Sequence, residues 1–411
     1  MKRKIVFTFF DSSEMGGVQA LFIRLAKFLQ KECDVFVLEA SSRSCFREFL
    51  WRDKVTFIKF CFRRVVLPSD AVVVMTPADV VLCGYMEGEN IRFLFWDLNL
   101  KVQTDVGMFR FLALLERRYR LGLEAKTRKF LMRLISPTLY SRLEDFFKTL
   151  NKKQGLICML KGGYRSSLNS FDIKIQEKVV PICVELGGFV EPNRNTDYIR
   201  VCWLGRFCDF KYPAIKGIIE ELHKFCRKYP KRNVHLDLVG YGSYENKIKR
   251  DCARYALDNF ITEFRGGITE KALKVYLRNN VDLLCAHGTS VLEGARFGVP
   301  SVICSGGCDS KENPKYLWLY EAEESCLGDI RGFRGGETLE GVLNELFRSP
   351  KTIARKCYEC VAKYYDVTVV APKFLSAVQE TEVTLEDIKK TKITKHTFLK
   401  KVDYLRINFP G

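Results

Sequence analysis

The 411-residue chain has no long apolar run. A membrane-spanning helix needs about 18 or more apolar residues, and the best candidate, residues 71–86, is interrupted by Thr76, Pro77 and Asp79. The apolar stretch near the start spans only residues 5–10 before Asp11, whereas a secretory signal needs about 7–15 such residues. We therefore expect neither a membrane span nor a signal peptide, and a first β-strand at this position.

Several motifs for metals and phosphates are also missing. The sequence has no D-x-D, no G-x-x-x-x-G-K-[ST] loop and no complete G-x-G-x-x-G. Its single C-x-x-C pair, Cys357 and Cys360, has no second pair at zinc spacing. We expect no bound metal or cofactor, and a reduced, cytoplasmic protein whose sixteen cysteines are mostly buried thiols.

Histidine is scarce and unevenly distributed. All four histidines lie in the second half of the chain, so a histidine base in the first half is excluded; they are His223, His235, His287 and His396. His287 lies in the candidate-site loop that follows residue 285, and His223 and His235 are expected to be structural.

Positive charge is abundant. Lys and Arg number 67 against 49 Asp and Glu, a net charge of +18, and residues 1–180 carry +12 of it (31 − 19). In residues 108–153, 12 basic and 4 acidic side chains alternate with aromatic and aliphatic ones. This stretch predicts helices that either dock on an anionic membrane or combine a solvated face with ordinary core packing.

Strand and helix patterns alternate along the chain. Residues 4–10 form a continuous apolar run that predicts a strand, and residues 18–31 have the apolar spacing of a helix. Residues 34–38 predict a second strand, so the three segments together form a βαβ unit. A second series begins near residue 199 and includes an amphipathic helix at 214–229. Further strands are expected at 72–75, 80–83, 92–96, 200–207, 234–239, 261–264, 281–285 and 301–304.

This alternation predicts an α/β protein with two doubly wound, Rossmann-like domains that face a cleft. We expect an N-terminal domain at 1–180, a linker at 181–198, a C-terminal domain at 199–365, and a final helix with a basic tail at 366–411. Ligands of such sheets bind at the carboxyl ends of the strands, so the loops that follow strands are the candidate sites.

Two of these loops carry notable residues. Arg206 and Lys211 follow a predicted strand that ends at Gly205. Two cations at this position suit the binding of a diphosphate. The alternative is that both are ordinary solvated surface cations. In the loop after residue 285, Ser290 and Glu293 have capping-box spacing, and the same helix start could bind phosphate.

The order of these motifs resembles the GT-B fold glycosyltransferases, and most closely family 4 with its bacterial lipopolysaccharide and capsule branch. The residues that carry the resemblance are Gly16-Gly17 after the first strand, Gly-Arg-x-x-x-x-Lys at 205–211, Leu-Val-Gly-Tyr-Gly at 238–242 and Gly-Thr-Ser-Val-Leu-Glu-Gly-Ala…Gly-Val-Pro at 288–300. The resemblance implies a metal-independent, retaining transferase. Its donor would be a nucleotide-diphosphate sugar, and its acceptor a glycan or a lipid-linked molecule in cell-surface polysaccharide synthesis.

The resemblance also implies roles for individual residues. Arg206 and Lys211 would hold the donor diphosphate, and Glu293 the ribose. The amides near Thr289 and Ser290 would touch phosphate, the backbone around Phe264 and Arg265 would receive the base, and Gly16 and Gly17 would approach the donor.

Two positions depart from the family pattern. Cys285 replaces a frequent acidic residue, and Asp97 or Asn99 lies where an N-terminal histidine is frequent. Our catalytic candidates are Asp97 and the cations Arg206 and Lys211, which would stabilise the charge on the leaving diphosphate. Because of these departures, a second hypothesis is that the chain is a non-catalytic nucleotide-sugar-binding or scaffold protein. An epimerase that shares the fold is a minor alternative. Because no nucleic-acid motif is present, we expect no nucleic acid as a partner. An anionic membrane surface remains an expected partner of a cytoplasmic, peripheral protein.

Overall fold

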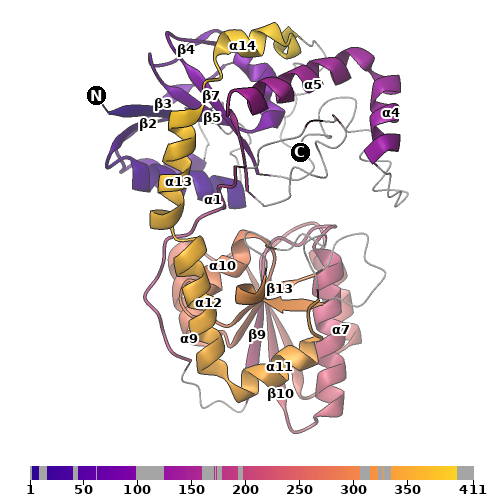
Figure 1. The fold of residues 1–411 in the computed structure, drawn as a ribbon. Helices are drawn as coiled ribbons and strands as arrows, with labels where there is room; N and C mark the ends of the chain where they lie inside the picture. The colour runs from indigo at the N-terminus through magenta and orange to yellow at the C-terminus, as the bar shows by residue number, and fades with distance from the viewer. Residues whose placement is uncertain are drawn as a thin grey trace. The chain divides into compact units, whose positions relative to one another are not determined.

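The chain divides into two compact units. The computed structural model describes residues 2–8, 16–39, 45–61, 63–98, 125–159, 171, 173, 178–192, 198–305, 315–322, 327 and 335–395. The N-terminal unit comprises Met1–Cys183 together with Val370–Gly411, and the C-terminal unit comprises Val184–Val369 (Figure 1). The division falls inside the segment expected to be the linker, and the last helices of the chain join the N-terminal unit.

A six-stranded parallel sheet forms the centre of the N-terminal unit. The strand order is β3-β2-β1-β5-β7-β8, so the chain winds outward in both directions from β1. Ile5 of β1 pairs with Val35 on one side and Val72 on the other. The strands are β1 (Arg3–Thr8), β2 (Cys33–Glu39), β3 (Val55–Lys59), β5 (Val72–Met75), β7 (Arg92–Asp97) and β8 (Leu156–Cys158).

The strand predicted at residues 80–83 is wrong. This segment lies in the 3-10 helix η1 (Pro77–Tyr85), which has Pro77 at its first position, and residues 80–83 are all buried. A short buried apolar run does not distinguish a strand from a helix, and proline favours the first turn of a helix. The small strands β4 (Val65–Val66) and β6 (Met86–Glu87) pair with each other beside this helix.

Helices surround the N-terminal sheet. The basic stretch is described from residue 125 onward, where it forms α4 (Ala125–Ile135) and α5 (Pro137–Lys152), with a break at Ser136 and Pro137; residues 108–124 lie outside the described residues. The other α-helices described before the C-terminal return are α1 (Gly17–Leu29) and α2 (Cys45–Leu50).

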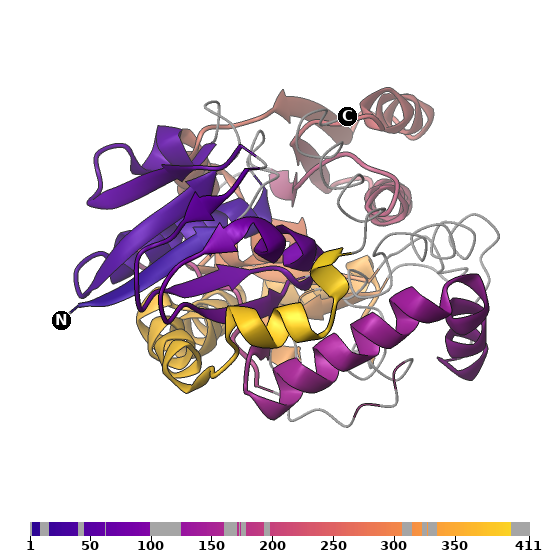
Figure 2. The ribbon, with the colours of Figure 1, turned by 90° about the horizontal axis from the view of Figure 1, so that it is seen from above.

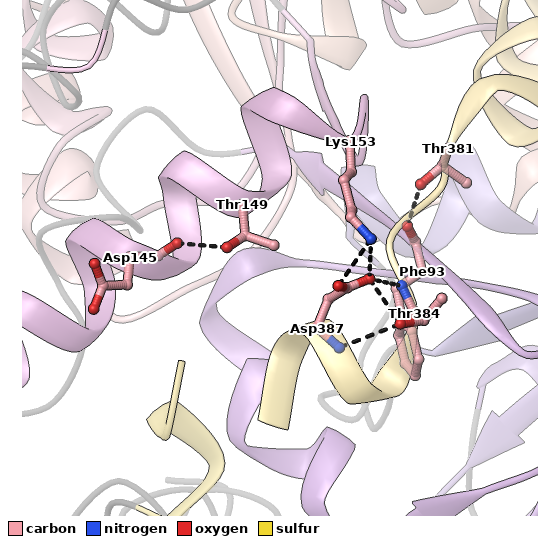
Figure 3. Close-up of polar contacts among 7 residues, drawn as sticks. All are labelled: Phe93, Asp145, Thr149, Lys153, Thr381, Thr384 and Asp387. Carbon is pink, nitrogen blue, oxygen red and sulfur yellow. Dashed lines mark hydrogen bonds and ion pairs between the residues drawn. The ribbon is translucent and has the colours of Figure 1, made fainter. Parts of the chain in front are cut away.

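The end of the described chain is fastened to the N-terminal unit. After α13 (Val367–Glu380), the Thr381 hydroxyl donates to the Phe93 carbonyl at 2.6 Å, and Lys153 Nζ lies 2.8 Å from both carboxylate oxygens of Asp387 (Figure 3). Thr384 and Asp387 form a capping box at the start of α14 (Leu385–Lys390). Figure 2 shows α14 beside α5, and η5 (Ile393–Lys395) follows it.

The C-terminal unit has a second six-stranded sheet, in the order β11-β10-β9-β12-β13-β14. Its strands are β9 (Tyr198–Leu204), β10 (Asn233–Val239), β11 (Phe260–Gly266), β12 (Leu283–Ala286), β13 (Ser301–Cys304) and the antiparallel β14 (Tyr316–Trp318). Its helices are α7 (Tyr212–Lys228), α8 (Glu245–Arg254), α9 (Glu270–Asn280), α10 (Thr289–Ala295), η3 (Leu319–Glu321), α11 (Leu339–Arg348) and α12 (Pro350–Tyr364). Figure 1 shows α7 on one side of this sheet and α10 and α12 on the other. The two doubly wound, Rossmann-like domains predicted from the sequence are confirmed.

Candidate functional site

The loop after β9 is tied to the loop after β10. The Gly205 amide donates to the Val239 carbonyl at 3.0 Å, and the Phe207 amide donates to the Tyr241 carbonyl at 2.9 Å. Gly240 has a φ of 147°, and a Cβ on it would lie 2.1 Å from the Gly205 carbonyl oxygen. Glycine is therefore required at 240, both for its conformation and for the close approach of the two loops.

Lys211 and Ser290 both lie beside Gly205. A Cβ on Gly205 would lie 2.9 Å from Lys211 Nζ and 3.8 Å from Ser290 Oγ. Lys211 precedes α7 as its N-cap residue, and Ser290 is the second residue of α10. The structure thus brings together two motifs about 80 residues apart, at the carboxyl ends of the adjacent strands β9 and β12.

This corner of the unit carries uncompensated positive charge. Arg206 is exposed and Lys211 is half-buried. Burial lowers the pKa of the Lys211 ammonium, and the neighbouring Arg206 charge lowers it further. Within the described part of the chain, no carboxylate forms an ion pair with either cation.

The loop between β12 and α10 differs from the prediction of a capping box. The N-cap of α10 is Gly288, whose φ is 63°, and no side chain caps the helix. The helix therefore begins before Ser290, and the Ser290 hydroxyl does not cap it. Glu293 lies 3.1 Å from the Arg296 Nε instead, one turn further along. The capping-box interpretation of Ser290 and Glu293 is wrong, and Thr289 and Ser290 form the first turn of α10.

His287 is the residue whose importance the sequence did not reveal. Its side chain is only 9% exposed, and its Nε2 has no hydrogen-bond partner within the described structure. The imidazole meets the Trp203 ring edge-on, with 5.5 Å between the centroids. Burial lowers the pKa of His287 to about 4, and the Lys211 charge acts in the same direction. The ring is consequently neutral near pH 7.

Arg265 has carboxylate partners of its own. Its Nε lies 3.1 Å from the buried Asp237 carboxylate, and its terminal nitrogen lies 2.6 Å from Glu263. The Tyr276 hydroxyl also donates to Asp237. The Phe264 ring meets Phe207 edge-on at 6.1 Å. The resemblance assigns the base to the backbone around these two residues, and this role stays a prediction.

The remaining candidates belong to the N-terminal unit. Gly16 is the N-cap of α1 and Gly17 its first residue; a Cβ on Gly16 would lie 2.7 Å from the Gln19 side-chain oxygen. Asp97 ends β7 and is buried, with 4% exposure. Asn99 lies outside the described residues. The catalytic role of Asp97 stays a prediction.

The described residues contain no group of three or more histidine, cysteine, aspartate or glutamate side chains placed to hold a metal ion. None of the helices that they form is long and apolar enough to cross a bilayer. The cysteines described are free thiols, and most of them are buried.

Comparison with known proteins supports the fold. No protein-family model matches the sequence, and no curated relative matches it either. A glycosyltransferase structure from Rickettsia africae ESF-5 is 12% identical with a TM-score of 0.57, and the match covers 92% of this chain and 98% of that one. The N-terminal domain of the trehalose-6-phosphate phosphatase from Candida albicans is 8% identical with a TM-score of 0.55, covering 93% and 98%. At these identities the likeness establishes the shared GT-B architecture of two Rossmann-like domains.

Proposed function

We propose that the protein is a glycosyltransferase that moves a sugar from a nucleotide-diphosphate sugar to a glycan or lipid-linked acceptor. The observation that carries this proposal is the pair of cations Arg206 and Lys211 in the loop after β9, neither of which has a carboxylate partner in the described structure. Lys211 Nζ and Ser290 Oγ lie beside the same glycine, Gly205. The likeness of the fold to a solved glycosyltransferase agrees with it. We further propose a retaining, metal-independent reaction in cell-surface polysaccharide synthesis, such as that of lipopolysaccharide or capsule.

The positive charge of Arg206 and Lys211 suits them to bind a diphosphate and to stabilise it as a leaving group. A half-buried ammonium without a counter-ion is costly, and a bound diphosphate would neutralise both cations through charge-assisted hydrogen bonds. When the bond between the sugar and the diphosphate breaks, negative charge builds up on the departing phosphate. Arg206 and Lys211 would stabilise that charge, which is the role a metal ion has in other transferases.

The residues around this pair would position the donor. Ser290 Oγ, which lies near Lys211 and is not used as a cap, would donate to a phosphate oxygen, together with the amides near Thr289. Glu293 would accept from the ribose hydroxyls, and its ion pair with Arg296 would orient the carboxylate. Asp97 would act at the acceptor side.

The acceptor would be presented at an anionic membrane surface. Helix α4 contains four basic residues, Lys126, Arg128, Lys129 and Arg133, and no acidic one. On the same helix Phe130 and Leu134 are 65% and 69% exposed, four residues apart and therefore on one face. A basic helix with exposed apolar side chains is typical of peripheral membrane binding, and a lipid-linked acceptor would be found there.

A non-catalytic nucleotide-sugar-binding or scaffold protein is the second candidate. It is favoured by Cys285, which is fully buried at the position of the frequent acidic residue, and whose pKa burial raises well above the usual range. Such a thiol cannot replace a carboxylate near pH 7. Both candidates predict donor binding, but only the enzyme predicts turnover.

The two candidates are distinguished with purified protein. A thermal-shift panel of nucleoside diphosphates and their sugars first identifies the ligand, because a ligand at 100 times its Kd stabilises the folded chain by about 2.7 kcal/mol. Release of nucleoside diphosphate from the sugar nucleotide is then measured with and without membrane extracts that contain acceptors. Turnover that disappears in Arg206→Ala and Lys211→Ala supports the transferase, and binding without turnover supports the second candidate.

A further inference from the structure

The buried imidazole of His287 has an unused hydrogen-bonding atom at the edge of the proposed donor site. Its Nε2 exposes less than 1 Å² and has no partner among the described residues. Leaving a buried polar group unpaired costs about 1–3 kcal/mol. Native proteins keep few such groups, and each one calls for an explanation.

The state of the ring identifies what this atom can do. A backbone hydrogen bond at Cys304 raises the pKa of His287, as a bond donated by the ring does, and burial and Lys211 outweigh it. Because Nε2 has no partner, this bond belongs to Nδ1. The neutral ring thus carries its proton on Nδ1 and a lone pair on Nε2, so the unused atom is an acceptor.

The surroundings identify the donor that this acceptor fits. Trp203, which the ring contacts, donates from its indole nitrogen to the Gly205 carbonyl at 3.3 Å. Lys211 Nζ and Ser290 Oγ lie beside the same glycine. Lys211 suits an anionic oxygen, but an ionised diphosphate offers few protons to a lone pair. A sugar attached to that diphosphate offers hydroxyl groups.

We propose that Nε2 of His287 accepts a hydrogen bond from a hydroxyl of the donor sugar, and that His287 therefore helps to determine which sugar is bound. This inference rests on the proposed function. Because Nε2 is covered, the hydroxyl reaches it after a neighbouring side chain moves. Lys211, whose charge acts on the ring, is the neighbouring side chain that a diphosphate would attract. His287 thus distinguishes a sugar nucleotide from a bare nucleoside diphosphate.

The test compares two kinds of ligand in three proteins. Calorimetry measures the binding of nucleoside diphosphates (uridine, guanosine, adenosine, cytidine and thymidine) and of their hexose conjugates to the wild type, His287→Phe and His287→Gln. His287→Phe keeps a ring against Trp203 but removes the acceptor, so we expect about a tenfold loss of affinity for the sugar nucleotide and unchanged affinity for the free diphosphate. His287→Gln places an amide oxygen near the position of Nε2, so it should retain most of the affinity.

The outcomes separate this inference from the function on which it rests. Equal affinity of wild type and His287→Phe for the sugar nucleotide overturns the role of His287 and leaves the donor site intact. If the wild type binds no member of the panel, both proposals fall.

A second measurement on the wild type does not depend on the folding of a variant. With ¹⁵N-labelled histidine, the Nε2 resonance of His287, assigned from its loss in His287→Gln, should move when the sugar nucleotide binds and much less with the diphosphate alone. A resonance that responds equally to both ligands overturns the inference.

Discussion

The Lys211 ammonium nitrogen lies 2.9 Å from the point where a Cβ would stand on Gly205. The short side chain of an alanine at 205 would therefore displace this cation, and the φ of 151° at Gly205 is one that residues with a Cβ rarely adopt. Lys211 and Gly205 thus form one unit of the proposed diphosphate site, in which glycine makes room for the charge.

The first prediction is that Gly205→Ala weakens nucleoside-diphosphate binding on the order of tenfold, because one charge-assisted hydrogen bond is lost. Backbone strain should also lower the free energy of unfolding by about 1–2 kcal/mol. Calorimetry and urea unfolding measure the two effects. Gly188→Ala is the matched control, because Gly188 has an ordinary φ and no atom within 4 Å of a built Cβ. Equal affinities in wild type and Gly205→Ala would contradict the geometry.

The second prediction concerns acid stability. The folded pKa of His287 is lowered to about 4, whereas an unfolded histidine has a pKa of about 6.5. The contribution of His287 to the free energy of unfolding is therefore complete above about pH 6.5. As the pH falls below this value, the unfolded chain binds a proton that the folded chain does not. The free energy of unfolding should fall between these values, by at most about 3 kcal/mol.

The control for this prediction is His287→Gln, which has no titrating group at 287. Urea unfolding of both proteins at several pH values should show that wild type loses more free energy of unfolding than His287→Gln between pH 7 and pH 4, by up to about 3 kcal/mol. Parallel curves for wild type and variant would show that the ring titrates normally in the folded chain.

Much of the fold was accessible from the sequence. Strands β5 and β13 begin and end at the predicted residues, and α7 lies within two residues of its predicted bounds. Each is a strongly patterned segment, and α7 has Pro213 in its first turn. The three-residue strands β8 and β14 were not predicted, because such short strands have no periodicity and are defined by their partners in the sheet.

The candidate site was accessible only in part. The spacing of Arg206 and Lys211 identified two cations after a strand, but the placement of Lys211 and Ser290 beside the same glycine depends on adjacent strands distant in sequence. The unused acceptor on His287 depends on how Trp203 and the backbone of Cys304 pack around the ring. No local pattern contains that information.

The third prediction tests the fastening of the C-terminal segment. Asp387 accepts from Lys153 and from the Thr384 amide and hydroxyl. Burial opposes its charge, but these bonds outweigh burial and lower the pKa of the carboxyl. Asp387→Ala should reduce the free energy of unfolding by about 2 kcal/mol, from the lost cap and the lost ion pair. Glu386→Ala, in the same turn but exposed, should change it by no more than about 0.5 kcal/mol. Equal effects of the two variants would contradict the role of Asp387.

The fourth prediction concerns α4. The chain should sediment with vesicles that contain anionic lipid, less so at high salt because ions screen the basic residues. Replacing both Phe130 and Leu134 by alanine should weaken binding about tenfold or more, because their apolar side chains would be buried in the interface. Val275→Ala, which removes an exposed apolar side chain from the C-terminal unit, should leave binding unchanged. If sedimentation depends neither on lipid charge nor on the double substitution, the proposal that α4 binds an anionic membrane is wrong.

The most direct test of the donor site is calorimetry of the tightest-binding nucleoside diphosphate with wild type and Lys211→Met. Methionine has a similar length but no charge, so it should fit the half-buried position and leave the free energy of unfolding equal to or above that of wild type. We predict an affinity at least about tenfold lower in Lys211→Met, from the lost charge-assisted hydrogen bond. Lys216→Met, on a partly exposed lysine of α7 that pairs with Glu220, should bind as wild type does. Equal affinities in wild type and Lys211→Met, or a wild type that binds no nucleoside diphosphate, would contradict the account.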